Sequence, residues 1–176
     1  MGYIYGFLRI QVLNMIVAES YGKNINIYII LIMFLIISII ICDIKRSTIP
    51  NSLNFLFLFF SIIFKGFTSE IVEKSVLGAA IYILPIIFIY GYLSDILQKE
   101  VIGFGDIKLI LGIGYILEYK SFYEIYLYYL IAFSIASCYI FISWLIFSKK
   151  LKKIPFAPFL LISFIYLYVR KFYELY

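Results

Sequence analysis

The chain has 176 residues, of which 65% are hydrophobic and 14% are charged, with a net charge of +5 and a mean hydropathy of +1.05. Soluble domains contain about a quarter charged residues, and a soluble fold of this size could not bury so much apolar surface. The composition therefore predicts an integral membrane protein and excludes a soluble domain.

Six apolar runs follow one another along the chain and predict an all-α, polytopic fold with about six transmembrane helices. They cover residues 25–42, 52–67, 75–93, 106–119, 122–147 and 155–169. Pro50 and Asn51 predict a break between the first two helices, with Asn51 or Ser52 as the cap of the second. The fourth run is the weakest, because Glu118 shortens it. We expect residues 25–172 to form a single membrane domain.

Residues 1–24 differ from the rest of the chain, because polar side chains interrupt their apolar pattern. A full membrane span is not expected there, and no basic segment precedes an apolar core as in a signal peptide. An interfacial helix is the preferred interpretation.

The lysines indicate how the helices are oriented. If all six runs span the membrane, the connections 44–50, 95–102 and 148–154 lie on one side, and they hold most of the loop lysines and arginines. The opposite connections hold only Lys65, Lys74 and Lys120. Basic loops face the cytoplasm, so Asp43 and Asp106, at the ends of the first and fourth runs, are both expected at the cytoplasmic boundary.

The residue types present restrict the chemistry. The chain has no histidine, which excludes Ser–His–Asp and Cys–His nucleophiles. Cys42 and Cys138 lie in or beside apolar runs without metal-ligand spacing, and we interpret them as small hydrophobic residues. Neither a metal nor a cofactor is expected. The basic segment 148–153 lies between two apolar runs, so it predicts a topology signal and not nucleic-acid binding.

Asp43 and Asp106 each have an ordinary interpretation when taken alone, as a solvated or capping residue at a helix end. Together, at the same membrane depth and on the same side of the membrane, they provide the two carboxyl groups that an acid/base pair requires. Peptide hydrolysis by two carboxyl groups needs one ionised group to activate water and one protonated group to polarise the carbonyl. Gly103 and Gly105 would then let an extended substrate backbone approach Asp106.

Three motifs in this order resemble the type IV prepilin peptidases, membrane aspartic proteases with a G-x-G-D motif. They are "DIKRSTIPN" from Asp43, "GFGDIKL" from Gly103, and "IPFAPF" over residues 154–159, where Ala157 replaces the usual glycine. The resemblance covers roughly residues 27–172. The paired C-x-x-C motifs of the longer bacterial members are missing, so the chain resembles the short, peptidase-only form without the methyltransferase portion.

The resemblance implies a membrane aspartic endopeptidase that removes the leader from type IV pilin-like or flagellin-like precursors. It implies Asp43 and Asp106 as the catalytic pair, in the cytoplasmic membrane with the active site on the cytoplasmic side. Further residues are expected to support the site: Gly103, Gly105, Lys108, Lys45, Pro50 and Asn51. The expected partners are a prepilin-like substrate and the lipid bilayer, not nucleic acid.

Three alternatives remain open. Presenilin-type and signal-peptide-peptidase-type proteases share G-x-G-D, but they resemble nine-span proteins with a tyrosine before the first aspartate, where this chain has Cys42. A small proton-coupled transporter subunit would tend to hold its carboxylates near the bilayer midplane, often in repeated halves. A structural subunit with aspartate caps is the third.

The helix dipoles suggest how the proton is shared. Asp43 is expected at the negative C-terminal end of a helix, and Asp106 at the positive N-terminal end of another. The sequence therefore predicts that Asp43 holds the shared proton and that Asp106 is the ionised base.

The orientation can be tested by fusing reporters into the connections 44–50, 95–102 and 148–154. We expect all three fusions to report a cytoplasmic location, because these loops hold most of the basic loop residues. Labelling of a cysteine in 95–102 by a membrane-impermeant reagent from outside the cell would contradict this orientation.

Overall fold

The computed structural model describes residues 29–100, 102–147 and 154–174, and every regular element in these ranges is a helix. A helix over residues 29–46 comes first. Five more follow it: α2 (Asn51–Lys65), α3 (Ser69–Leu97), α4 (Phe104–Leu117), α5 (Phe122–Phe147) and α6 (Ala157–Glu174). The all-α prediction is confirmed, and each expected run coincides with a helix. The interfacial helix expected over residues 1–24 lies outside the described residues.

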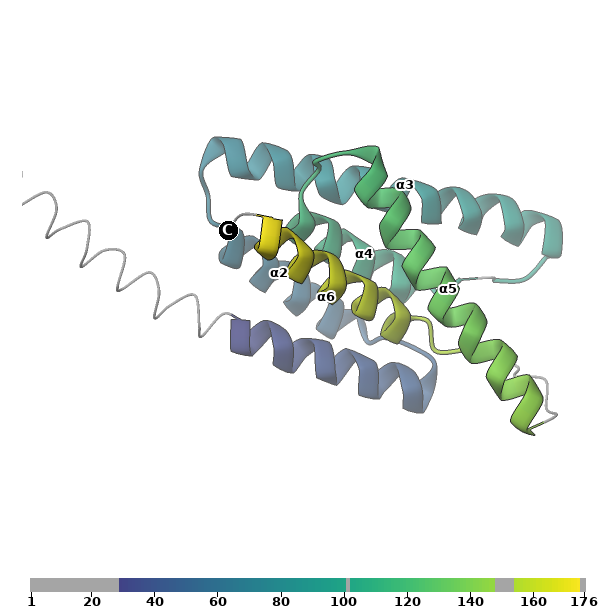
Figure 1. Ribbon diagram of the computed structural model, residues 1–176. Coiled ribbons are helices and arrows are strands. Elements are labelled where there is room, and N and C mark those ends of the chain that lie inside the picture. The colour runs from purple at the N-terminus through teal and green to yellow at the C-terminus, as the bar shows by residue number, and fades with distance from the viewer. Residues whose placement is uncertain (1–28, 101, 148–153, 175–176) are drawn as a thin grey trace, which may run out of the picture.

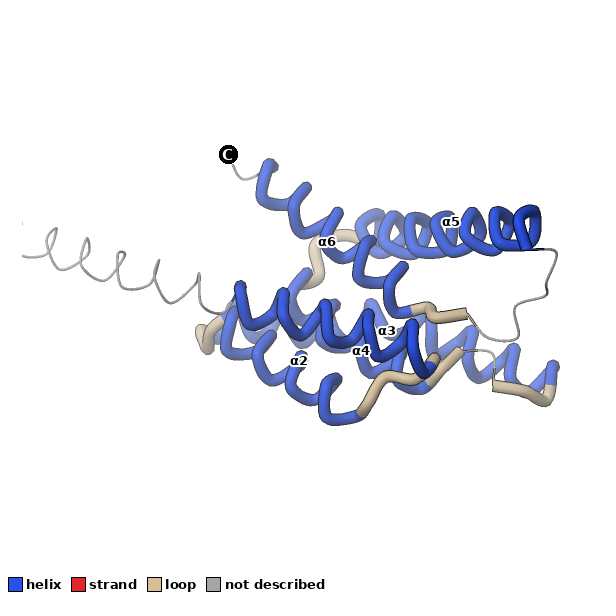
Figure 2. Tube along the Cα trace, turned by 90° about the horizontal axis from the view of Figure 1, so that it is seen from below, coloured by secondary structure: helices blue, strands red, loops and turns tan. Residues whose placement is uncertain are grey.

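The helices run back and forth, so that successive connections lie at alternate ends of the bundle (Figure 1). The end of the helix over 29–46 and the starts of α4 and α6 lie at one end, which we call the aspartate end because Asp43 and Asp106 lie there. In both views α4 lies in the middle of the bundle (Figures 1 and 2). It packs against α2, α3 and α6, whereas α5 packs mainly against α6.

Two helices are long and apolar enough to cross a membrane, α3 and the segment Phe122–Ile146 of α5. Most of their large apolar side chains are exposed, for example Phe88 on α3 and Trp144 on α5, as expected for surfaces that face lipid. The other described helices are shorter. At 1.5 Å per residue, the 14 residues of α4 span only about 21 Å, less than the hydrocarbon core of about 30 Å. The count of six spans is therefore not confirmed.

The short α4 is the most deeply buried helix. Every residue from Gly112 to Leu117 is buried, together with Leu109 and Ile110 on the preceding turn. A helix that is apolar on all sides is stable only when other elements surround it. Helices α2, α3 and α6 supply that surrounding.

Glycines allow α3 and α4 to approach closely. A Cβ atom on Gly78 of α3 would lie 2.5 Å from the backbone oxygen of Gly114 and 2.7 Å from the Glu118 backbone. A Cβ on Gly114 would lie 2.8 Å from the Gly78 oxygen. Small residues at such crossings let helix backbones touch in membrane proteins. The two glycines therefore set the distance between α3 and α4.

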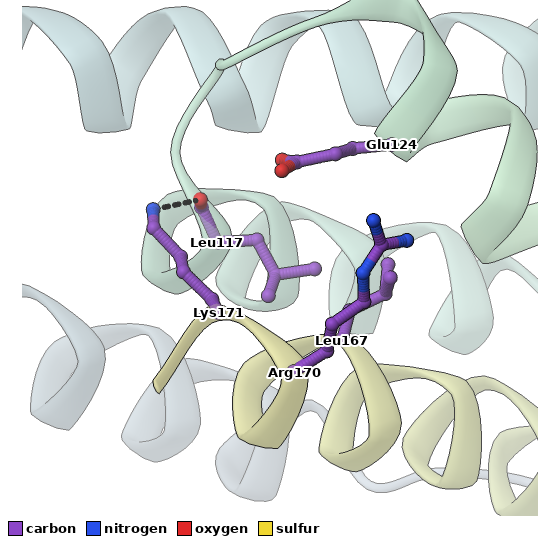
Figure 3. A pocket seen from close by; sticks show the side chains of 5 residues that line it. All are labelled: Leu117, Glu124, Leu167, Arg170 and Lys171. Atoms are coloured by element: carbon purple, nitrogen blue, oxygen red, sulfur yellow. Dashed lines mark hydrogen bonds between the residues drawn. The ribbon is translucent and has the colours of Figure 1, made fainter. Parts of the chain in front are cut away.

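The end of α4 that lies away from the aspartates is held by ion pairs. Glu118 follows the last residue of α4 and pairs with Lys65 at 2.6 Å and with Lys171 at 3.1 Å. The Lys171 ammonium also donates a hydrogen bond to the Leu117 carbonyl at 3.0 Å, beside a small pocket between α4, α5 and α6 (Figure 3). Glu118 thus joins the ends of α2, α4 and α6.

The surroundings of Glu118 act on its protonation in opposite directions. Partial burial favours the neutral acid, but the hydrogen bonds and positive charges of Lys65 and Lys171 together outweigh burial and hold the pKa of Glu118 below its usual range. A depressed pKa of this kind stabilises the fold above the unfolded pKa, and this stabilisation is lost as the pH falls through the folded pKa.

The helix starts differ from the expected caps. Pro50 is the N-cap of α2 and makes no side-chain cap, and Asn51 is the first helical residue, so the predicted Asn51 or Ser52 cap is wrong. Gly103 is the N-cap of α4, and Asp106 lies in its first turn. Asn51 is therefore not a cap, and Asp106 is not the N-cap residue of its helix.

The α3–α4 contact can be tested by replacing each of two glycines on α3 with alanine in separate variants. Gly78→Ala would force two backbones apart, and overpacking of this kind costs about 1–3 kcal/mol. We expect a clear fall in the unfolding midpoint of the purified protein in detergent. Gly91→Ala is the matched control on α3, because nothing lies within 4 Å of its Cβ position. Equal effects of the two substitutions would contradict the close approach.

The ion pairs of Glu118 predict a pH-dependent contribution to stability. At neutral pH, Glu118→Gln should lower the unfolding free energy by about 1–2 kcal/mol, because it leaves two partly buried ammonium groups without their carboxylate. Denaturation curves of wild type and variant should converge as the pH falls below the ordinary value of 4.5. Glu70→Gln is the control, because its ion pair with Lys74 is largely exposed, and it should change little. A constant difference at all pH values would count against this role.

Candidate active site

Asp43 lies in the last turn of the helix over 29–46, and only 4% of it is exposed. Its Oδ2 accepts a hydrogen bond of 2.9 Å from the backbone N–H of Ala157. A buried carboxylate is stable only with such partners, and an N–H bond to a carboxylate is stronger than one between neutral groups. The first helical residue of α6 therefore holds a carboxyl group from a helix more than a hundred residues earlier in the sequence.

The sequence at the start of α6 explains why Ala157 is the donor. The next residue, Pro158, has no N–H group. Phe159 and Leu160 both donate their N–H groups to the Phe156 carbonyl. Among residues 157–160, the N–H of Ala157 is the one that is directed to Asp43. Pro158 thus lies in the first turn of α6 and supplies no N–H group beside Ala157.

Asp106 lies in the first turn of α4, where 8% of it is exposed. Its Oδ1 is buried and has no hydrogen-bond partner in the described part of the chain. The carboxyl groups of Asp106 and Asp43 are near enough for their charges to interact. The fold therefore brings together, at one end of the bundle, the two carboxyl groups singled out from the sequence.

The two glycines of G-x-G-D have different surroundings. Gly103 is exposed, and a Cβ placed there would lie 3.2 Å from Oδ2 of Asp106. A Cβ on Gly105 would instead lie 3.2 Å from the Cβ of Ile49. Gly103 is thus exposed and lies directly against the carboxyl group of Asp106. Gly105 allows close packing of α4 on the loop before α2.

The remaining expected residues are only partly brought to this end. Lys108 donates a hydrogen bond of 2.8 Å to Asn51 Oδ1 and lies 4.9 Å from the centre of the Phe104 ring. Pro50 is the N-cap of α2 and is half-buried. Lys45 is exposed, and within the described ranges no hydrogen bond or ion pair joins it to either aspartate. Lys108 and Asn51 therefore connect α4 to α2, whereas Lys45 lies apart.

Asn54 was missed by the sequence interpretation. It is 4% exposed, and its Nδ2 donates a hydrogen bond of 2.9 Å to the Gly105 carbonyl. A signal was present, because Asn54 is a polar residue inside an apolar run, and such residues are functional candidates in membrane proteins. Asn54 is a second connection between α2 and the G-x-G-D segment.

The structure shows no cluster of metal ligands near the aspartates or elsewhere in the ranges that it describes. There, no group of three or more histidine, cysteine, aspartate or glutamate side chains could hold a metal ion. The site consists of two carboxyl groups, backbone N–H and C=O groups, and the side chains of Asn51, Asn54 and Lys108 around them.

Comparison with known proteins agrees with this arrangement. The sequence model of the type IV leader peptidase family matches residues 29–146, which include both aspartates and the G-x-G-D segment. No curated protein matches the chain significantly. No solved structure matches it significantly either.

Proposed function

The chain belongs to the type IV leader peptidase family, and we propose that it is an aspartic endopeptidase that removes the leader peptide from type IV pilin-like or flagellin-like precursors. The observation that carries this proposal is the buried pair Asp43 and Asp106. The two residues come from helices far apart in the sequence, and their carboxyl groups interact at one end of the bundle. Clustered buried carboxyl groups of this kind are typical of catalytic sites.

In the proposed reaction, Asp43 is the ionised base and Asp106 holds the shared proton. Asp43 removes a proton from water as the water oxygen bonds to the scissile carbonyl carbon, and the proton of Asp106 passes to the carbonyl oxygen. The resulting diol collapses: one hydroxyl returns its proton to Asp106, and Asp43 gives its proton to the leaving nitrogen. The C–N bond breaks, and the pair returns to its starting state.

The hydrogen bonds favour this assignment over the one expected from the helix dipoles. The Ala157 N–H is directed to Asp43, and such a donor favours the ionised carboxylate. Burial favours the neutral acid at both groups, but Oδ1 of Asp106 is buried without a partner in the described ranges, whereas neither oxygen of Asp43 is. Two carboxyl groups at short range cannot easily both ionise. One proton between them is therefore placed on Asp106.

We place the site at the cytoplasmic face of the cytoplasmic membrane. Support comes from the basic residues expected in the connections on the side of the two aspartates. The two aspartates lie in the last turn of one helix and the first turn of another, and not at the middle of either helix, which also favours a peptidase over a proton-coupled transporter subunit. The exposed Gly103 supports approach of an extended leader peptide next to Asp106.

Substitution of the pair tests the proposal. Asp43→Asn and Asp106→Asn should each abolish cleavage of a co-expressed, tagged precursor that has a short basic leader before an apolar helix. Both variants should still insert and fold, because asparagine has nearly the same shape. Immunoblots of precursor and product measure the cleavage. Cleavage at the normal rate by either variant would overturn the aspartic mechanism.

The proton assignment has its own measurement. Infrared spectra of the purified protein near neutral pH should contain a protonated carboxyl band that disappears in Asp106→Asn and remains in Asp43→Asn. The reverse pattern would support the assignment expected from the helix dipoles. Because two coupled groups titrate as a unit, a pH–rate profile alone does not distinguish the two assignments.

A further inference from the structure

The peptide group that links Gly105 to Asp106 is held at both of its polar atoms. Its carbonyl oxygen, on Gly105, accepts the hydrogen bond of 2.9 Å from Asn54 Nδ2. Its N–H, on Asp106, donates a bond of 3.0 Å to the Gly103 carbonyl. A peptide group is planar, so two fixed atoms at its opposite sides fix its rotation. Because Asp106 itself lies in the first turn of α4, the direction of its Cα–Cβ bond is then fixed too.

The two hydrogen bonds of this peptide group act directly beside a glycine, Gly105. Gly105 lies in the first turn of α4, and a glycine restricts the backbone less than other residues do. A Cβ on Gly105 would lie 3.2 Å from the Ile49 Cβ, which is closer than ordinary van der Waals contact. A glycine thus stands directly before a buried carboxyl group, and the hydrogen bond from Asn54 restrains it in addition to the bonds of α4 itself.

Burial of the Asn54 side-chain amide, which donates this hydrogen bond, costs free energy, and this argues against an incidental contact. Asn54 is 4% exposed among the apolar residues of α2. Burial of an amide without partners is unfavourable, and its Oδ1 has no partner in the described residues. A leucine or methionine would fill such a position at no polar cost. An apolar side chain could not, however, bind the Gly105 carbonyl.

The contact with Asn54 belongs to a pair of contacts on either side of Asp106. Asn51 and Asn54 lie three residues apart, on one face of α2. Asn54 binds the residue before Asp106, and Asn51 binds Lys108, two residues after it. The Asn51 contact is exposed, and water can replace its hydrogen bond, whereas the Asn54 contact is partly buried. Asn54 is therefore the stronger restraint.

We propose that Asn54 is a positioning residue for the reaction, which fixes the orientation of the Asp106 carboxyl group through the Gly105–Asp106 peptide. The inference rests on the proposed function and deepens it. Asn54 touches neither substrate nor the reacting atoms, and its effect is on the geometry of the proton donor. Small misplacements of a catalytic group reduce the rate far more than the binding of substrate.

The test compares substitutions at two buried polar residues of α2. Asn54→Leu removes the donor but keeps the number and branching of the side-chain heavy atoms, and Asn54→Ser leaves a smaller side chain that cannot overpack. Ser61→Ala is the matched control. Ser61 is fully buried on α2, but its hydroxyl donates to the Phe57 carbonyl of its own helix. Unfolding midpoints in detergent establish that each purified variant is folded.

Cleavage kinetics are measured with the same tagged precursor, which has a short basic leader before an apolar helix. We expect kcat to fall about tenfold to a hundredfold in both Asn54 variants, with KM changed less than about threefold. Ser61→Ala should keep the wild-type kcat. A folded Asn54→Leu with the kcat of Ser61→Ala would overturn the proposal, as would an equal loss of kcat in all three variants.

Infrared spectra supply a measurement without substrate. The protonated carboxyl band that is lost in Asp106→Asn should shift in both Asn54 variants and stay unchanged in Ser61→Ala. An unmoved band would overturn the positioning role. If the wild-type protein does not cleave the precursor, the proposed function fails. The band then still decides whether Asn54 orients Asp106.

Discussion

Between Lys108 and Glu118, α4 has no charged residue and is buried almost completely, so it must be surrounded by other helices. Its packing partners are α2, α3 and α6, and the close approach at Gly78 and Gly114 brings α3 nearer than ordinary side chains would allow. The two ends of α4 are fixed by different chemistry. Glu118 joins two lysines at one end, and the segment from Gly103 to Lys108 is tied to α2 at the other. The position of Asp106 follows from these contacts.

The short length of α4 has a consequence for the depth of the site. At 1.5 Å per residue, α3 extends over about 43 Å and α4 over about 21 Å. Helices as long as α3 cross the whole hydrocarbon core, whereas a helix as short as α4 does not. Asp106 lies in the first turn of α4, and the start of α4 is recessed relative to the end of α3 (Figure 1). In a substrate with a leader peptide followed by an apolar helix, the junction between the two parts would lie at this depth.

Much of this organisation could be predicted from the sequence. The apolar runs locate the helices, Glu118 marks the end of α4, and alternation of helix direction places Asp43 and Asp106 at one end. The contacts that define the site could not be predicted in this way. The Ala157–Asp43 and Asn54–Gly105 bonds join residues 114 and 51 positions apart, and they depend on how the helices pack. For the same reason, the role of Gly105 in packing against Ile49 was not foreseen, and substrate approach was expected at both glycines.

Two helix ends have opposite electrostatic effects on the ionisation of Asp43, and the hydrogen bond from Ala157 adds to one of them. The C-terminal end of its own helix disfavours an anion, and the N-terminal end of α6 favours one. Dipole effects at exposed sites are worth about 0.3–1 kcal/mol and fall off within a turn, whereas a direct N–H bond to a carboxylate contributes about 1.5–3 kcal/mol. The direct bond at 2.9 Å therefore outweighs the more diffuse field. Pro158 contributes to this result, because it supplies no N–H of its own beside Ala157. The segment over residues 154–159 thus supplies a backbone donor that favours the ionised form of a carboxyl group on another helix.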